Sequence, residues 1–520
     1  MNSRTFDNFS GGMNNRANPA AISDKESPLC QNIDLDQYGK ICKRRGSRFL
    51  FSAARTSNVT WIGQHRTAAG VYKILFTEGT KLYSCDTDGT DVTDITDTLT
   101  LTSGSDIHTN AVYCSISGLP YIVGANNTNA LWRWSGTGNA ELLTAGGTST
   151  NCPTTAKCVE WYDNYLICAN VVETTTRYTN KFTWSAVNAP NDWTASDYIL
   201  IGSAVDPIVG MVKFQKSIIV LKEHSVWKVV WDNSLSTPTF VPYVINPKIG
   251  CAAQGTIAVT DNQIIWLSHD GVYTYDGRGT DEESVAKVSY QLEAESWATN
   301  WHTTRKDYAH AVYYRHRDQY RLFITEGSTQ ETAQQNRTYY AFHVQLGAWT
   351  KGTTSANVSA IIDVGSRQYL MVADYAKQVN RLDYLDTSTG KYVDDDNGVK
   401  IDGYWYTKDY TMGSPGLEKA WNDLSIIMNS TSEAQTLTVT QYANYGNYTK
   451  AGTLSMQEDA GMIGSFIIGQ SKLGGGTTVQ ETLLLAGESR VVRFLFRNNN
   501  MGEYFSIIGY TVTWEPARHY

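Results

Sequence analysis

The sequence predicts an all-β protein, a β-propeller of seven blades with six as the alternative, together with an N-terminal arm and a C-terminal β-sandwich. Aromatic residues make up 12% of the 520 residues and Gly is frequent, which favours strands and tight turns over helices. A three-strand pattern recurs about every 50 residues through the middle of the chain. Neither end of the chain follows this repeat.

The repeated unit consists of two apolar strands joined by a short polar turn and a third strand rich in aromatic side chains. Turns such as Ser117-Gly118 and Asp163-Asn164 supply the positive φ angles that tight hairpins need. Radial repetition of small sheets explains the spacing better than one large β-sandwich, which seldom contains seven similar units. The first strands begin near Val59, Val112, Lys157, Ile208, Thr256, Ala309 and Val358.

Residues 51–390 are therefore predicted to form the propeller. A propeller needs a join between its first and last blades, because an open sheet edge otherwise remains. The strand-like stretch at residues 48–51 precedes the first repeat. We expect it to pair with the last blade, near Tyr369–Val372 or Gln378–Leu382.

Residues 284–302 interrupt the repeat between its fifth and sixth units. Val285, Val288, Leu292 and Trp297 follow a nearly helical period, with Glu and Lys residues between them. This pattern predicts a short inserted helix whose apolar stripe packs against the core.

The two ends are predicted to form separate modules. Residues 1–50, with a formal net charge of +3, are predicted to form an extended arm with a small hairpin over residues 32–41. Residues 402–520 alternate like strands with one buried face, which predicts the β-sandwich. Within the arm, Lys43, Arg44 and Arg45 are candidate partner-docking residues. A solvated basic face and a contact with DNA are the alternatives for this cluster.

No pattern typical of catalysis or of a cofactor or metal site is present. The chain has no GxSxG, HExxH or P-loop motif, and we expect it not to be an enzyme. Residues 86–91 imitate part of a calcium loop but lack its final Glu, so an ordinary turn is preferred. Residues 394–398, Asp-Asp-Asp-Asn-Gly, are interpreted as a solvated loop. A carbohydrate-binding or glycan-hydrolysing propeller is the alternative function, because paired carboxylates cannot be identified without a family.

Charge and cysteine content exclude further classes. A net charge of −8 argues against a dedicated nucleic-acid binder, although an acidic wall lets DNA pass without holding it. The eight Cys form no CxxC pair and are predicted to be free, mostly buried thiols of a protein made in a reducing cytoplasm. The first 12 residues contain no apolar run typical of a signal peptide, and no stretch is apolar enough to span a membrane.

Residues 9–14, at the opening of the chain, are Phe-Ser-Gly-Gly-Met-Asn. They resemble the F-x-G-G-x-N entry that is usual in bacteriophage tail propeller proteins. Residues 39–46 match their G-x-L-x-x-R-x-G hairpin, with Ile41 in place of Leu. Further similar segments are Trp184-Ser185, Pro190–Trp193, Ser225–Trp227 and Trp266–Gly277.

This resemblance, over roughly residues 5–385, is to the tail nozzle subunits of short-tailed phages. It implies a structural protein of the virion tail, made in the host bacterial cytoplasm, that assembles with itself as a ring, usually a hexamer. The ring would lie below the head-to-tail adaptor, provide the exit channel for genomic DNA, help retain packaged DNA and dock tail fibres or spikes. The arm with Lys43, Arg44 and Arg45 would then dock on a neighbour or on the adaptor, and the sandwich on an adjacent subunit. Deleting residues 1–45 would leave the propeller folded but impair assembly.

Overall fold

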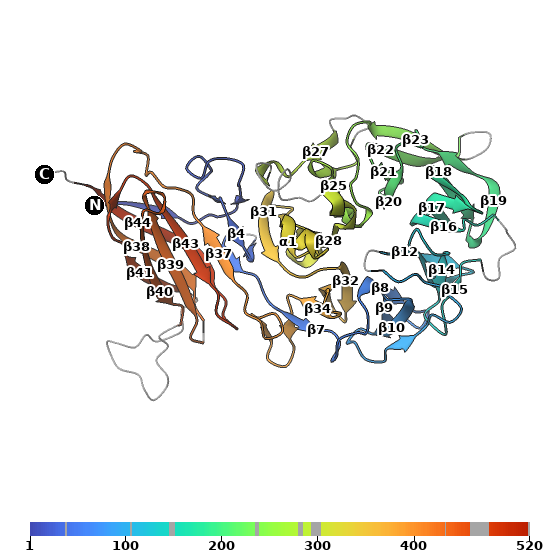
Figure 1. Cartoon of the computed structure of the whole chain (residues 1–520), viewed down its shortest axis with the longest axis horizontal. Coiled ribbons are helices and arrows are strands. Elements are labelled where there is room, and N and C mark those ends of the chain that lie inside the picture. The colour runs from blue at the N-terminus through green and yellow to red at the C-terminus, as the bar shows by residue number, and fades with distance from the viewer. Residues whose placement is uncertain are drawn as a thin grey trace.

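A ring of small sheets and a β-sandwich lie next to each other along the longest axis of the molecule (Figure 1). The computed structural model describes the chain except for residues 37–38, 105–106, 145–150, 235–238, 279–283, 293–302, 432, 458–477 and 518–520.

The ring is a β-propeller, and its described residues form seven blades of four antiparallel strands, of which the sixth is extended to a six-stranded sheet by two short parallel strands. The predicted fold class is confirmed. Each first strand starts within two residues of its predicted position. The first strands are β8 (Val59–Arg66), β12 (Asn110–Ile116), β16 (Thr155–Tyr162), β20 (Ile208–Phe214), β24 (Ala258–Val259), β28 (His310–Tyr314) and β32 (Val358–Val364). These strands lie next to one another around the axis, and β32 of the last blade contacts β8 of the first.

The second and third strands also fall where the repeat places them. The second strands are β9 (Tyr72–Glu78), β13 (Leu119–Ala125), β17 (Tyr165–Glu173), β21 (Ser217–Lys222), β25 (Ile264–Ser268), β29 (Gln319–Ile324) and β33 (Arg367–Ala373). The third strands are β10 (Lys81–Asp86), β14 (Trp132–Trp134), β18 (Thr176–Ala186), β22 (Val226–Asp232), β26 (Gly271–Tyr275), β30 (Thr338–His343) and β34 (Val379–Leu382).

Each blade has a fourth, outermost strand that the three-strand repeat did not include. Some of these strands are only two residues long and largely exposed, so no hydrophobic period marks them. They are β11 (Thr93–Asp94), β15 (Glu141–Leu142), β19 (Ala189–Leu200), β23 (Thr239–Asn246), β27 (Val285–Lys287), β31 (Ala348–Thr353) and, in the seventh blade, β7 (Ser47–Phe49).

The interruption at residues 284–302 differs from the predicted helix. Its first part is the strand β27, which pairs with β26 and completes the fifth blade. A single 3-10 turn, η3 (Tyr290–Leu292), follows and buries Leu292. The apolar spacing that imitated a helical period therefore comes from a strand followed by a turn. Trp297 lies outside the described residues.

The strand β7 closes the ring, as predicted. It pairs antiparallel with β34, with Phe49 opposite Asn380 and Ser47 opposite Leu382. The Leu50 amide then donates to the Val379 carbonyl at 2.7 Å. The last blade thus combines three strands from the end of the repeat with one from before its beginning, which leaves no gap between first and last blades.

Hydrophobic side chains fill the wedges between neighbouring blades. In the described residues, six clusters each lie between two adjacent blades, including one between the seventh and the first. A seventh cluster begins between the fifth and sixth blades and continues into the sandwich, through Phe9, Trp349 and Trp405. Burial of apolar surface is the main favourable term in folding, so this shared core fixes the two bodies to each other.

The sandwich consists of two sheets whose inner faces pack together. Its first sheet contains, in order, β41 (Thr478–Leu484), β38 (Lys419–Asn429), β44 (Ser506–Pro516), β6 (Ile41–Lys43) and β5 (Ile33–Leu35), with β1 (Asn2–Phe6) along β44 and β42 (Glu488–Ser489) along β38. Its second sheet contains β4 (Cys30–Gln31), β37 (Gly403–Tyr406), β43 (Val492–Asn498), β39 (Thr436–Ala443) and β40 (Tyr448–Ser455).

The first 50 residues differ from the separate arm that we predicted. Strands β1, β4, β5 and β6 belong to the sandwich sheets, and the predicted hairpin is the β5–β6 pair. Strand β2 (Gly12–Met13) instead runs parallel to β31 of the sixth blade and to β3 (Glu26–Ser27). The N-terminal segment is therefore part of both bodies.

The remaining described elements are short. They are β35 (Leu385–Asp386), β36 (Lys391–Tyr392), α1 (Gly327–Thr332), η1 (Gln254–Thr256), η5 (Thr303–Tyr308), η6 (Arg315–Arg317) and η7 (Asn444–Gly446). No helix in the described residues is long and apolar enough to cross a membrane. The eight Cys are free, and all but the half-buried Cys152 are buried, as predicted.

Candidate functional site

The predicted docking residues lie where the chain passes between the two bodies. Residues 43–47 lead from β6 to β7, and residues 383–402 lead from β34 back to β37. The two segments touch: the Gly46 amide donates to the Val393 carbonyl at 2.7 Å, and the Ser47 amide to the Asp395 carbonyl at 3.0 Å. A Cβ atom on Gly46 would lie 2.0 Å from the Asp395 carbonyl oxygen, so only glycine fits. We call residues 43–48 and 393–397 the joint.

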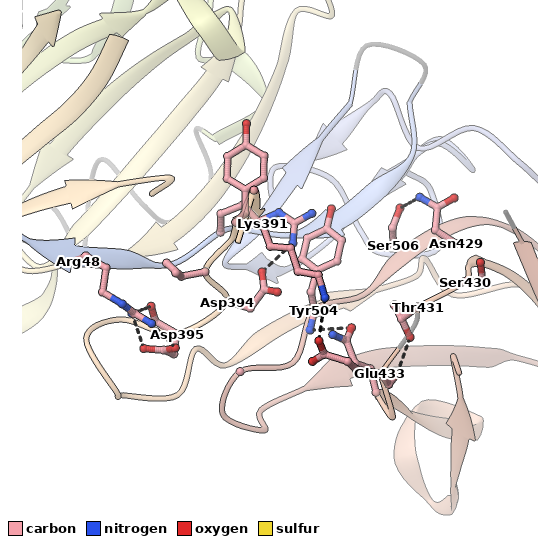
Figure 2. Close-up of a pocket in the computed structure, with 16 residues that line it drawn as sticks. Arg48, Lys391, Asp394, Asp395, Asn429, Ser430, Thr431, Glu433, Tyr504 and Ser506 are labelled. Atoms are coloured by element: carbon pink, nitrogen blue, oxygen red, sulfur yellow. Dashed lines mark hydrogen bonds and ion pairs between the residues drawn. The ribbon is translucent and has the colours of Figure 1, made fainter. Parts of the chain in front are cut away.

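The basic and acidic clusters of the joint pair with each other. The Arg48 guanidinium donates to both carboxylate oxygens of Asp395, at 2.7 and 3.0 Å (Figure 2). Because these carboxylates are engaged by guanidinium groups, the interpretation of residues 394–398 as a solvated loop is wrong for its three Asp residues. The three pairs are Arg44–Asp396, Arg45–Asp394 and Arg48–Asp395.

Two of the three predicted docking residues are buried inside the subunit. Lys43 is 1% exposed and Arg44 is 6% exposed. The Lys43 ammonium donates to Asn498 Oδ1 at 2.7 Å and to the Glu503 carbonyl at 2.8 Å. Burial lowers the pKa of Lys43 to about 8. This placement corrects the docking role expected of both residues, because their charged groups contact the sandwich and the joint of their own chain.

Asn32 connects the joint to both bodies. Its Oδ1 accepts from Arg44 Nε and from the Thr353 amide of β31, both at 2.9 Å, and its Nδ2 donates to the Asp402 carbonyl at 2.9 Å. Burial opposes the charge of Arg44, but the adjacent Asp396 carboxylate outweighs it and raises the pKa of Arg44. The Arg44 side chain is thus held charged in the interior by a nearly complete set of acceptors.

Arg45 is half-buried and lines a cavity of about 550 Å³ between the joint and the sandwich. Its guanidinium lies 3.4 Å from the ring centroid of Tyr504, a close cation–π contact. At the mouth, Lys391 and Glu433 form an exposed ion pair at 2.9 Å. The charged residues that line this cavity are paired with one another, so the arrangement suits a connection between two bodies better than the capture of an ion.

A second buried ion cluster lies beside the joint and was not predicted. Asp383, 1% exposed, accepts from Arg321 Nη2 at 3.0 Å and lies 3.5 Å from Arg317 Nη2. Burial alone would raise the pKa of Asp383, but the two guanidinium groups outweigh it and lower that pKa. Asp383 lies about 60 positions after the two Arg residues in the chain, so no local sequence pattern predicts their contact.

A cavity of about 440 Å³ lies at the end of the propeller axis where β12 and β16 begin. Among the described residues, Asp307 is the one carboxylate in its lining, beside His108, Lys157 and Gln254. Glycoside hydrolysis usually needs two carboxyl groups about 5 to 9.5 Å apart. The described lining does not supply that pair.

The calcium-like segment forms an ordinary turn after β10. Asp88 Oδ1 accepts from the Thr90 amide at 2.9 Å and hydroxyl at 2.7 Å, and Lys73 pairs with Asp86 at 2.5 Å. In the part of the chain that the structure describes, no three His, Cys, Asp or Glu side chains converge to hold a metal ion.

The fold defines the chain as a β-propeller protein with an attached sandwich. No protein-family model matches the sequence, and no curated protein matches it. Similar solved structures include the Pan2 WD40 domain of Neurospora crassa, with 7% identity, a TM-score of 0.39, and coverage of 67% of this chain and 97% of that one. Another similar structure is BBS1N in a complex with ARL6DN, with 9% identity and a TM-score of 0.40. This match covers 65% of the present chain and 97% of BBS1N.

A third similar structure is PorZ of Porphyromonas gingivalis, described as a surface component of the type-IX secretion system. It has 12% identity and a TM-score of 0.37, and the match covers 78% of this chain and 46% of PorZ. At these identities and TM-scores the likeness extends to the propeller fold alone.

Proposed function

We propose that this protein is a structural subunit of a phage tail, which forms a nozzle ring through which the genome leaves the head. The ring contacts the head-to-tail adaptor on one side and tail fibres or spikes on the other. Its channel passes DNA without sequence specificity, in keeping with the net charge of −8.

The observation that carries the proposal is the place of the motif residues in the structure. Phe9 and Met13 of the F-x-G-G-x-N entry are each 1% exposed and lie in the core shared by propeller and sandwich. Gly12 has a φ of +65°, and a Cβ there would lie 2.5 Å from the Trp349 carbonyl of the sixth blade. Arg44 and Gly46 of the second motif belong to the joint. The two motifs at the start of the chain thus lie where the two bodies are fixed to each other.

The molecule also has two different ends, which a head-to-tail ring requires. Strands β19 and β23 lie at the end of the propeller away from the sandwich, and β41 lies at the sandwich end (Figure 1). Exposed apolar side chains occur at both ends, with Leu200 at 54% and Tyr243 at 48% on the propeller and Leu484 at 69% on the sandwich. Obligate interfaces are large and apolar at their centres.

Sedimentation of the purified full chain over a range of concentrations tests this function. We expect a discrete species of several subunits, and we expect Leu200→Glu to shift it toward the 57.8 kDa monomer without changing the circular dichroism spectrum. Val71→Glu, at an exposed position of the first blade, serves as the control. A monomer at every concentration that also hydrolyses glycans would favour the alternative function.

A further inference from the structure

A cavity of about 430 Å³ on the sandwich brings three tyrosine rings together beside an ion pair. Tyr406 ends β37, Tyr442 is near the end of β39, and Tyr445 lies in the turn η7. Leu29, which precedes β4, completes one side. This cavity is separate from the joint and from the propeller axis.

The two charged residues of this cavity, Arg493 and Asp409, pair with each other. Arg493 Nε and Nη2 donate to the two carboxylate oxygens of Asp409 at 2.7 and 2.8 Å, and Asp409 is 3% exposed. The strand register places Arg493 directly opposite Tyr442. Because one full positive and one full negative charge cancel here, the cavity favours neither an anion nor a cation.

Two of the tyrosines form one wall. The ring centroids of Tyr406 and Tyr442 lie 6.1 Å apart, with the rings tilted by 38°. Burial, with a hydrogen bond to Tyr442, raises the pKa of Tyr406 to about 12, so its hydroxyl stays neutral near pH 7. The wall therefore offers apolar ring faces with neutral hydroxyl groups at their edges.

The third tyrosine is held in a backbone conformation that costs free energy. Tyr445 has φ 59° and ψ 28°, in the left-handed region, and its neighbour Asn444 has φ 46°. A side chain with a Cβ atom is unfavourable there, and glycine would be preferred. The Tyr445 ring is nonetheless 75% exposed at the cavity, where it gains little from packing within the subunit. Strain of this kind is found at binding sites.

We propose that this cavity binds a neutral sugar ring, such as one pyranose unit of a polysaccharide. The apolar C–H face of a pyranose matches a tyrosine face, and its hydroxyl groups match the tyrosine hydroxyls and the remaining donors of Arg493. A quaternary ammonium ligand would also stack on aromatic rings, but the cavity has no net negative charge to balance it, because Asp409 is already paired with Arg493. This inference goes beyond the proposed function and does not depend on it.

The test is calorimetric titration of the full chain with neutral oligosaccharides of glucose, galactose, mannose and N-acetylglucosamine. We expect at least one to bind with a dissociation constant on the order of 1 mM, as for a small open site. We expect Tyr445→Gly to weaken this binding at least about tenfold while the melting temperature stays equal or rises, because glycine relieves the backbone strain.

Tyr448→Ala, which removes another exposed tyrosine of the sandwich, is the matched control and should bind like the unaltered chain. Absence of binding by every neutral oligosaccharide would overturn the proposal. So would a preference for cationic chitosan or anionic oligouronate oligomers. A lower melting temperature in Tyr445→Gly with unchanged sugar affinity would show a purely structural role for the residue.

Discussion

At the scale of single residues, close backbone contact and buried charge determine which side chains the joint accepts. Gly46 lies against the Asp395 carbonyl. The side-chain amide of Asn32 forms hydrogen bonds with three partners from different parts of the chain. Any side chain at residue 46 would clash with this carbonyl, and replacing Asn32 would leave buried polar groups unpaired.

Gly46→Ala should lower the free energy of unfolding by about 3 kcal/mol, because the new methyl group forces the two crossing segments apart. Urea unfolding followed by circular dichroism measures the change. Gly416→Ala is the control, since a Cβ there meets nothing within 4 Å, and it should stay within about 0.5 kcal/mol of the unaltered chain. Equal effects at both positions would contradict the steric account.

A buried histidine makes stability fall in mild acid. His310 lies 4% exposed between Ser359 and Ala356, near His108, and burial lowers its pKa to about 3. Below pH 6.5 the unfolded chain takes up a proton that the folded chain does not, so stability is lost as pH falls. His310 alone should lower the free energy of unfolding by about 2 kcal/mol between about pH 7 and pH 5. Urea unfolding of His310→Gln should show a smaller loss of stability over that pH interval than the unaltered chain shows. An equal loss in both chains would exclude His310 as the cause.

At the scale of elements, the strands next to the propeller axis could be predicted closely, whereas the contacts of the joint could not. The seven first strands recur at a regular spacing and each contain apolar side chains. The closing strand at residues 48–51 was recognisable because it lies outside the repeat. Both signals are local in the sequence.

The joint depends on contacts between residues about 350 positions apart, such as Arg44 with Asp396. Each cluster alone is typical of a solvated surface, and only the fold brings them together. The outer strands β11 and β15 lacked any apolar pattern, and β27 with η3 imitated a helical period. The aromatic cavity of the sandwich combines β37, β39 and η7 and had no sequence signature.

Asp396→Ala should destabilise the chain by about 3 kcal/mol, because it leaves the buried Arg44 guanidinium without its carboxylate. The double variant Arg44→Met with Asp396→Ala should recover part of that loss. Lys391→Ala, which breaks the exposed ion pair with Glu433, is the control and should change the free energy of unfolding by less than about 1 kcal/mol. Chemical denaturation of the unaltered chain, the single variants Arg44→Met and Asp396→Ala, and the double variant measures the coupling. Additive effects would show that Arg44 and Asp396 do not act as a pair.

At the scale of the whole molecule, the N-terminal segment acts as a structural part of both bodies. Deleting residues 1–45 removes four strands of the sandwich together with Asn32 and Arg44, but keeps the closing strand β7. We therefore expect the sandwich to lose its fold, in contrast to the deletion of a free arm. Limited trypsin digestion with mass spectrometry should show rapid cleavage after residue 402 and protection of residues 51–390. Protection of both regions would show that the segment is dispensable for folding.

Electron microscopy of the purified full chain is the measurement that tests the proposed nozzle most directly. The shared core and the joint fix the sandwich to the propeller, so each subunit should enter an assembly as one elongated body. The account predicts closed rings of identical subunits around an open central channel. Isolated elongated particles at every concentration, with no ring in the absence or presence of a head-to-tail adaptor, would contradict it.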